Sequence, residues 1–215
     1  DMNGKKYAEN ISQLALANVD FDMQNRHHIS YNLMMIHANT QSVGDYNGKN
    51  SIFSDDYENL GFTRRQQTND NMLIVNQLMT NWGLTKSLSL DAGASYNMVK
   101  GYEPDRRINN LTKAEDGYTL LRGNSQQRYF STLDEDDLNV KAGLVYRLKD
   151  NIEEISNVRF GYTGRFVDDN FKATEYNLTV GHVSVIPSLD DFSLDDYYNQ
   201  ENFASDWFKI QKNLD

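Results

Sequence analysis

Apolar and polar residues alternate with a period of two through much of this chain. In residues 87–99, SLSLDAGASYNMV, the even positions from Leu88 to Met98 are all apolar or aromatic. The odd positions from Ser87 to Asn97 are all small or polar. Because successive residues of a β-strand point to opposite faces, this pattern predicts a strand with one apolar face and one wet face.

The same alternation recurs in about seven segments, whereas helix-period patterning is scarce. The segments are 11–23, 28–38, 71–83, 88–99, 138–148, 155–166 and 172–186. Short turns are expected at 24–27, 84–87 and 149–154, and long polar loops at about 39–70 and 100–136. We therefore expect an all-β, antiparallel fold with about seven to eight strands over about 11–186, and a loop or tail over 187–215.

Run length and charge favour a membrane-spanning barrel over an ordinary sheet. Strands in globular proteins average about 5–6 residues, whereas a tilted membrane strand needs about 9–11. Charges in the cleanest runs occupy the polar phase, and an Arg or Lys facing mid-membrane lipid costs about 2–4 kcal/mol. Phe21, Trp82 and Tyr146 each precede a short turn, as in an interfacial aromatic girdle. A soluble antiparallel sheet produces the same alternation, so a soluble all-β surface binding module, carbohydrate-binding in type, is the alternative.

Bulk composition narrows the function classes. The formal net charge of -10 argues against nucleic-acid binding, which needs a basic surface. The absence of cysteine excludes disulfide scaffolds, thiolate metal sites and cysteine nucleophiles. We find no nucleophile elbow, phosphate-binding loop or dinucleotide fingerprint, and therefore expect no enzyme and no cofactor.

The strand count suggests that the chain is part of something larger. Bacterial single-chain barrels close with an even number of strands, and an open sheet edge in lipid would leave backbone groups unpaired. We expect residues 1–215 to be a partial β-barrel domain. Strict alternation of strand direction would put the polar tail on the short-turn side. Either one strand is miscounted, or 167–170, VDDN, is a kink inside one long strand.

Aromatic side chains in the expected long loops are the candidate ligand contacts, because exposed rings stack on flat or sugar-like ligands. They are Tyr57, Phe62, Tyr102, Tyr118, Tyr129 and Phe130. The segment EPDRR supplies Glu103, Asp105, Arg106 and Arg107. For these four we favour a structural ion-pair network among loops over substrate contact.

Acidic clusters offer oxygen atoms that suit calcium, but the spacing of a calcium-binding loop is missing. The clusters are Asp134, Glu135, Asp136, Asp137 and Asp190, Asp191, Asp195, Asp196. We favour solvated loop charge and expect no metal site.

Several segments resemble the barrel of Bacteroidetes TonB-dependent outer-membrane receptors. They are YNLMMIHANTQSVGDY (31–46), FTRRQQTNDNMLIVNQLMTNW (62–82), GYEPDRRINNL (101–111), GNSQQRYFSTLDEDDL (123–138) and FGYTGRFVDDNFKATEYN (160–177). The resemblance covers most of 10–185 and fades in the tail. EPDRR, together with the QQRYF…LDEDDL segment, is its strongest element.

That resemblance implies a 22-stranded barrel with an N-terminal plug domain and a short periplasmic box that contacts TonB. Neither the plug nor the box is visible in this chain. It further implies an outer-membrane location, contact with lipid, and energy-driven uptake of a large nutrient such as a siderophore, a vitamin, a glycan or a peptide. TonB would bind through regions outside residues 1–215, and a surface lipoprotein is left open as a partner.

Overall fold

The computed structural model describes residues 1–23, 26–151, 154–182, 185–186, 189 and 194–214. Within them the chain is all-β, with nine strands in one antiparallel sheet. The strands are β1 (Met2–Met23), β2 (His27–Lys49), β3 (Leu60–Gly83), β4 (Leu88–Ala114), β5 (Gly117–Leu120), β6 (Gly123–Asn151), β7 (Glu154–Val180), β8 (Val185–Ile186) and β9 (Phe208–Leu214). The helices are a 3-10 turn, η1 (Asp55–Tyr57), and the short α1 (Leu194–Tyr197) and α2 (Gln200–Ala204).

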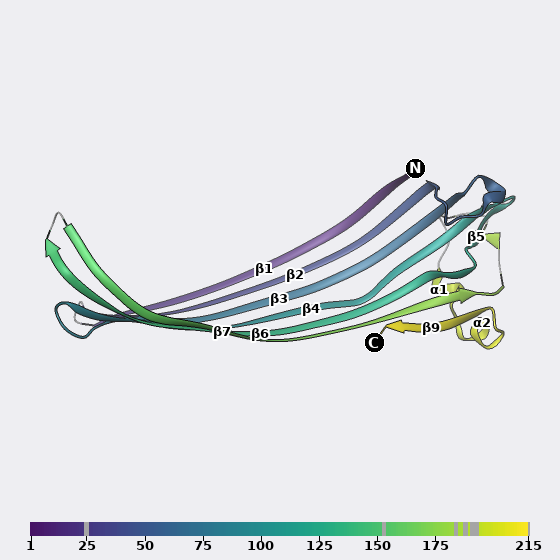
Figure 1. Ribbon diagram of the computed structural model, residues 1–215. Helices are drawn as coiled ribbons and strands as arrows, with labels where there is room; N and C mark the ends of the chain where they lie inside the picture. The colour runs from purple at the N-terminus through teal and green to yellow at the C-terminus, as the bar shows by residue number, and fades with distance from the viewer. Residues whose placement is uncertain (24–25, 152–153, 183–184, 187–188, 190–193, 215) are drawn as a thin grey trace.

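Six long strands lie side by side in the order β1-β2-β3-β4-β6-β7, and β9 adds to the β7 edge (Figure 1). The small strands β5 and β8 pair beside β4. The sheet of the described residues is open, not closed into a barrel. Residues 84–87, which connect β3 to β4, lie at one end of the sheet, which we call the turn end. The expected turns at 24–27 and 149–154 lie partly outside the described residues, and β6 and β7 occupy 149–151 and 154. The other end, which we call the loop end, carries the N-terminus, η1, β5, α1 and α2.

The expectation of long polar loops over 39–70 and 100–136 is wrong. Most of both segments belongs to strands, and β4 and β6 are 27 and 29 residues long. Polar side chains occupy both faces of these extensions, so the alternation that identifies a strand disappears there. Cross-strand polar pairs stabilise them instead, such as Thr63 Oγ1 donating to Asn110 Oδ1 at 2.7 Å.

The expected segments 155–166 and 172–186 are mainly one strand. β7 runs unbroken from Glu154 to Val180 and contains 167–170, so the interpretation as one long strand is confirmed. The tail therefore leaves the sheet at the loop end. It is more ordered than expected, since α1 and α2 precede β9, which pairs with β7 from Glu175 to Val180.

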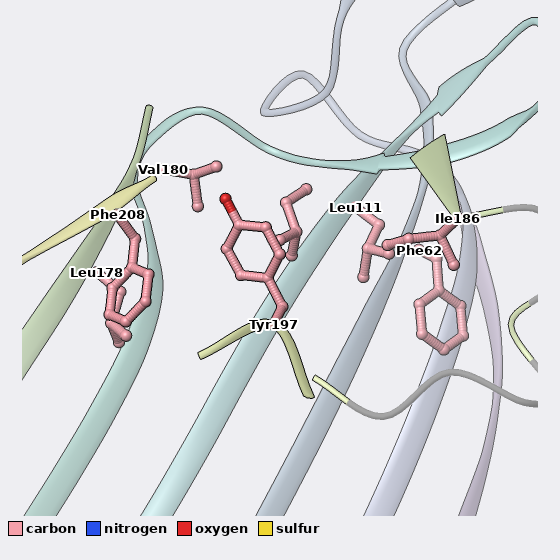
Figure 2. Close-up of a cluster of buried hydrophobic side chains, with 8 residues drawn as sticks. Phe62, Leu111, Leu178, Val180, Ile186, Tyr197 and Phe208 are labelled. Atoms are coloured by element: carbon pink, nitrogen blue, oxygen red, sulfur yellow. The ribbon is translucent and has the colours of Figure 1, made fainter. Parts of the chain in front are cut away.

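A hydrophobic cluster forms where the tail folds over the sheet at the loop end. Its members are Phe62, Leu111, Leu120, Leu178, Val180, Ile186, Tyr197 and Phe208. Figure 2 shows the Tyr197 ring between Leu178 and Phe208 on one side and Leu111 on the other. The Tyr197 hydroxyl donates to the carbonyl of His182 at 2.6 Å, which satisfies the polar end of this buried ring. The cluster joins strands that are distant in sequence.

A buried amide repairs the ladder near this cluster. The β6–β7 register shifts between Gly123 and Gln126, and Gln126 is fully buried. Its Oε1 accepts from the backbone N–H of Asn110 at 2.9 Å, and its Nε2 donates to the Asn110 carbonyl at 2.7 Å. The side chain thereby supplies a partner for the Asn110 N–H and a second partner for its carbonyl, which also accepts from the Leu121 N–H at 2.9 Å.

We expect Leu111→Ala to loosen the loop end. Leu111 is fully buried in the cluster, and such truncations cost about 2–5 kcal/mol. Hydrogen exchange of the full-length protein should show faster exchange in β5 and β9. Leu84→Ala, at a half-exposed position at the turn end, is the control and should leave these amides unchanged. Unchanged exchange in Leu111→Ala would contradict the role of the cluster.

Candidate functional site

Strand register brings the apolar phases of the six long strands onto one face. Residues paired across an antiparallel ladder project from the same face. Ala92 pairs with Thr80 and Ala142, and Ala142 pairs with Tyr162. We call this side the apolar face, and the side carrying Asp91 the polar face. The apolar positions that the sequence pattern predicts for each strand therefore lie on the same side of the sheet, with no one-residue slip between strands at this level.

The apolar face carries a continuous belt, which we call the apolar belt. It comprises alternate residues of 11–23, 29–35, 72–82, 88–98, 138–146 and 158–166. None of these positions is Asp, Glu, Lys or Arg. Among the described residues the belt lies open, with Phe160 81% exposed and Phe21 58% exposed. An apolar surface of this extent marks contact with lipid or another apolar surface.

The loop-end edge of the belt is slanted. One register row runs through Ala15, Met35, Ile74, Met98, Asp136 and Asp168. On β6 and β7 the first charged residues of this face, Asp136 and Asp168, lie within that row. Toward the loop end, the first charge lies two residues beyond the row on β4 (Lys100), four beyond it on β3 (Asp70) and six beyond it on β1 (Glu9). Among the six long strands, only β2 departs from this progression, because its first charge on the apolar face is Asp45. The loop-end edge of the belt thus shifts by six residues toward the loop end over the five strand-to-strand steps from β7 to β1.

The expected girdle residues follow the same slant at the turn end. Phe21, Trp82 and Tyr146 all lie on the apolar face. Relative to the row through Phe21 and Ala92, Trp82 lies two residues and Tyr146 four residues nearer the turns. Both edges of the belt therefore move toward the turn end from β1 to β7.

Part of the polar face is wet at the level of the belt. One row holds Asn18, Asn32, Gln77, Ser95, Asn139 and Arg165. Asn18 Nδ2 donates to Asn32 Oδ1 at 2.5 Å, and Asn32 Nδ2 donates to Gln77 Oε1 at 3.3 Å. Arg165 Nη2 lies 3.0 Å from Asp137 Oδ2. This face offers hydrogen bonds and charges to water or to a polar partner.

The six aromatic candidates do not form one ligand site. Phe62 is only 6% exposed and packs edge-on against Tyr118, with ring centroids 6.5 Å apart. Phe62 is thus a core residue, which sequence reasoning missed because its strand looked like a loop. Tyr57 in η1 and Tyr102 on β4 remain exposed but lie apart.

Neighbouring residues Tyr129 and Phe130 point to opposite faces of β6. The Arg106 guanidinium lies over the Tyr129 ring at 4.1 Å, on the polar face. Phe130 packs edge-on against Tyr176 at 6.0 Å, on the apolar face. Alternate projection along a strand separates this pair, although they are adjacent in sequence.

The EPDRR segment forms a β-bulge with an ion-pair network. The β4 register shifts between Glu103 and Arg106, so one extra residue turns Asp105 to the apolar face. Pro104 is tolerated there because a bulge needs no ladder N–H. Asp105 accepts from Arg107 Nε at 2.6 Å and from Arg128 Nη2 at 2.5 Å. Arg106 lies 3.7 Å from Glu103 on the other face.

Arg128 is the network member that the sequence reading missed. It pairs directly with Arg107 in the β4–β6 register, so two guanidinium groups stand side by side with the Asp105 carboxylate between them. Burial raises the pKa of Asp105, but hydrogen bonds from Arg128 and Arg107 outweigh it and hold that pKa below its usual value. The carboxylate is therefore ionised under physiological conditions.

Acidic residues 134–137 do not converge on a calcium site. Asp134 and Asp136 project from the apolar face, whereas Glu135 and Asp137 project from the polar face. In the part of the chain that the structure describes, no group of three or more potential ligands could hold a metal ion. Asp190 and Asp191 lie outside the described residues.

We expect Asp105→Asn to lower the free energy of unfolding by about 1–3 kcal/mol at pH 7, since charged hydrogen bonds are lost. A carboxyl group whose pKa is lowered by folding contributes its full stabilisation above its unfolded-state pKa of about 4. This contribution is lost as the pH falls through the folded-state pKa. The difference from wild type should therefore shrink in acid. Thermal unfolding from pH 7 to pH 3 measures it, with Asp116→Asn in an exposed turn as the control. A difference that does not depend on pH would contradict the carboxylate's role.

No protein-family model matches this chain, and no curated protein sequence matches it. None of the described helices is long and apolar enough to span a membrane.

Proposed function

We propose that residues 1–215 form part of the wall of an outer-membrane β-barrel receptor of the Bacteroidetes TonB-dependent type. The receptor takes up a large nutrient by TonB-driven transport. The observation that carries this proposal is the charge-free apolar belt, which crosses all six long strands and has slanted, parallel edges.

The slant supports strands that are tilted in a bilayer. A shift of six residues corresponds to about 20 Å along a strand, and five steps between strands to about 24 Å across the sheet. A level membrane surface would then cross strands tilted by about 40°, within the range of about 35–45° for outer-membrane barrels. At that tilt the β4 belt from Leu88 to Met98 is about 25 Å tall, which matches the apolar band of such barrels.

The remaining geometry fits the same orientation. The polar face would line a wet lumen, because its amides and charges could not face lipid. The loop end would lie outside the cell, since barrels of this class have short periplasmic turns and long extracellular connections. On β4, strand beyond Lys100 would project about 35 Å above the bilayer, presenting the ion-pair network and the aromatic tail to the surroundings.

The alternative is a soluble binding module, in which a second sheet would cover the apolar belt. In such a module the apolar belt would be protected from water by protein and would not contact lipid. A nitroxide attached at Ala94→Cys separates the two proposals, because the chain has no other cysteine. In a membrane the probe should collide with oxygen and not with a water-soluble nickel chelate. Protection from both reagents would favour the soluble module.

Orientation is tested with two exposed positions in the full-length protein. Ser51→Cys lies at the loop end and Lys86→Cys at the turn end. A membrane-impermeant maleimide should label Ser51→Cys on intact cells, and Lys86→Cys only after the outer membrane is opened. Energy coupling is tested by co-purification with the periplasmic domain of TonB. Equal labelling would contradict the orientation, and no co-purification would contradict TonB-driven transport.

We expect a sharp difference between Arg substitutions at two adjacent residues of β4. Ala94→Arg, on the apolar face in the middle of the belt, should destabilise folding into lipid vesicles by about 2–4 kcal/mol. Ser95→Arg, on the polar face, should cost less than about 1 kcal/mol because its charge reaches water. Equilibrium refolding into vesicles measures both values. Equal costs would contradict the assignment of the two faces.

A further inference from the structure

The turn end of the sheet carries a hollow of about 850 Å³, which we call the turn-end hollow. Charged and titratable side chains from four separate segments of the chain line it, namely Asp22, Arg26, His28, Lys86 and Arg147. Its volume falls in the range of about 300–1,000 Å³ that is typical of small-molecule sites. None of the candidate residues of the sequence analysis lies here, because the segments that form the hollow are far apart in the sequence.

Backbone hydrogen bonds hold these segments together. The Gly83 N–H donates to the Arg26 carbonyl at 2.8 Å, which joins the residue before β2 to the end of β3. The Arg147 N–H donates to the Ser87 carbonyl at 2.8 Å, which joins β6 to the connection between β3 and β4. A Cβ at residue 83 would lie 2.9 Å from the Arg26 carbonyl oxygen, so glycine permits this close approach. The backbone therefore fixes the walls of the hollow.

Cations outnumber anions in the turn-end hollow. Among the described lining residues Asp22 alone is acidic, and its Oδ1 lies 2.8 Å from His28 Nδ1. Neither Arg26 nor Lys86 forms an ion pair within the described part of the chain. With both histidines neutral, three cations and one carboxylate leave an excess of two positive charges in a chain whose formal net charge is -10. This local field would attract an anion.

Uncharged polar groups adjoin these cations. The side chains of Asn81, Ser87 and Ser89 line the same hollow, and none of them hydrogen-bonds to another described residue. His27 also lines it, and its Nδ1 is buried without a hydrogen-bond partner among the described residues. Guanidinium, ammonium, hydroxyl and amide groups are the donors with which proteins bind phosphate oxygens. A phosphate monoester carries about −1.5 to −2 charges at pH 7, which matches the excess positive charge better than a single carboxylate does.

We propose that the turn-end hollow binds a phosphoryl group. Arg26 and Lys86 hold its oxygens from two neighbouring connections, Arg147 adds positive charge from β6, and the hydroxyls of Ser87 and Ser89 donate to it. The proposal does not rest on the proposed function, because the site lies outside the apolar belt and is the same whether lipid or protein covers that belt. The group belongs either to a phospholipid headgroup or to a soluble phosphorylated molecule.

Equilibrium dialysis of the full-length protein in detergent micelles against radiolabelled inorganic phosphate tests this proposal. Wild type should bind phosphate, and Arg26→Gln and Lys86→Gln should each weaken binding severalfold. Lys6→Gln, at an exposed lysine of the loop end, is the control and should leave the affinity unchanged. No phosphate binding, or equal affinities in Lys86→Gln and Lys6→Gln, would overturn the proposal.

Competition identifies the source of the phosphoryl group. Displacement of phosphate by dihexanoyl-phosphatidylglycerol at much lower concentrations than by glycerol phosphate would support a lipid headgroup. Similar potency of the two competitors would support a soluble phosphorylated molecule. Succinate should compete poorly, and displacement by succinate as effective as by glycerol phosphate would overturn the assignment to a phosphoryl group.

A glycine substitution tests the geometry without removing a charge. Gly83→Ala should weaken phosphate binding severalfold, because the added Cβ displaces the Arg26 backbone. Gly143→Ala is the matched control, since the nearest atom to its Cβ would lie at an ordinary contact distance of 3.6 Å. Equal affinities in Gly83→Ala and Gly143→Ala would overturn the placement of Arg26 in the site.

Discussion

The face on which each side chain lies depends on strand register. Because the side-chain period of a strand is two, a slip of one residue would move every side chain of that strand to the other face. From Phe21 through Thr80, Ala92 and Ala142 to Tyr162, the ladder keeps residues of the apolar phase in one row. The belt and the slant of its edges both follow from this alignment. A one-residue shift of β1, β4, β6 or β7 would place charged residues within the belt, such as Asp20, Asp91 or Arg165.

The β4 bulge is one of the places among the described residues where that period is broken. Residues before it, such as Tyr102, face the apolar side at even positions, and residues after it, such as Arg107, do so at odd positions. The extra residue lets Asp105 reach both Arg107 and Arg128. The bulge therefore exchanges one ladder position for a three-residue ion-pair network.

The two ends of the sheet are stabilised by different physics. At the belt level neither face buries a core among the described residues, so stability there depends on what covers the apolar side. At the loop end, ion pairs such as Arg64–Asp45 at 2.8 Å and the aromatic cluster around Tyr197 hold the long extensions together. This division suits a structure whose middle is immersed in an apolar medium and whose end projects into water.

Much of the architecture could be predicted from sequence, because alternation directly reports two unlike environments. The apolar phases of 88–98 and 138–148, the connection at 84–87 and the antiparallel all-β fold were readable in this way. The lengths of the strands were not, since 39–49 and 100–114 carry polar residues on both faces and lack a regular alternation. Nor were the burial of Phe62 or the pairing of Arg128 with Asp105. Each of these requires residues from separate strands to meet, and only the tertiary register decides which residues become neighbours.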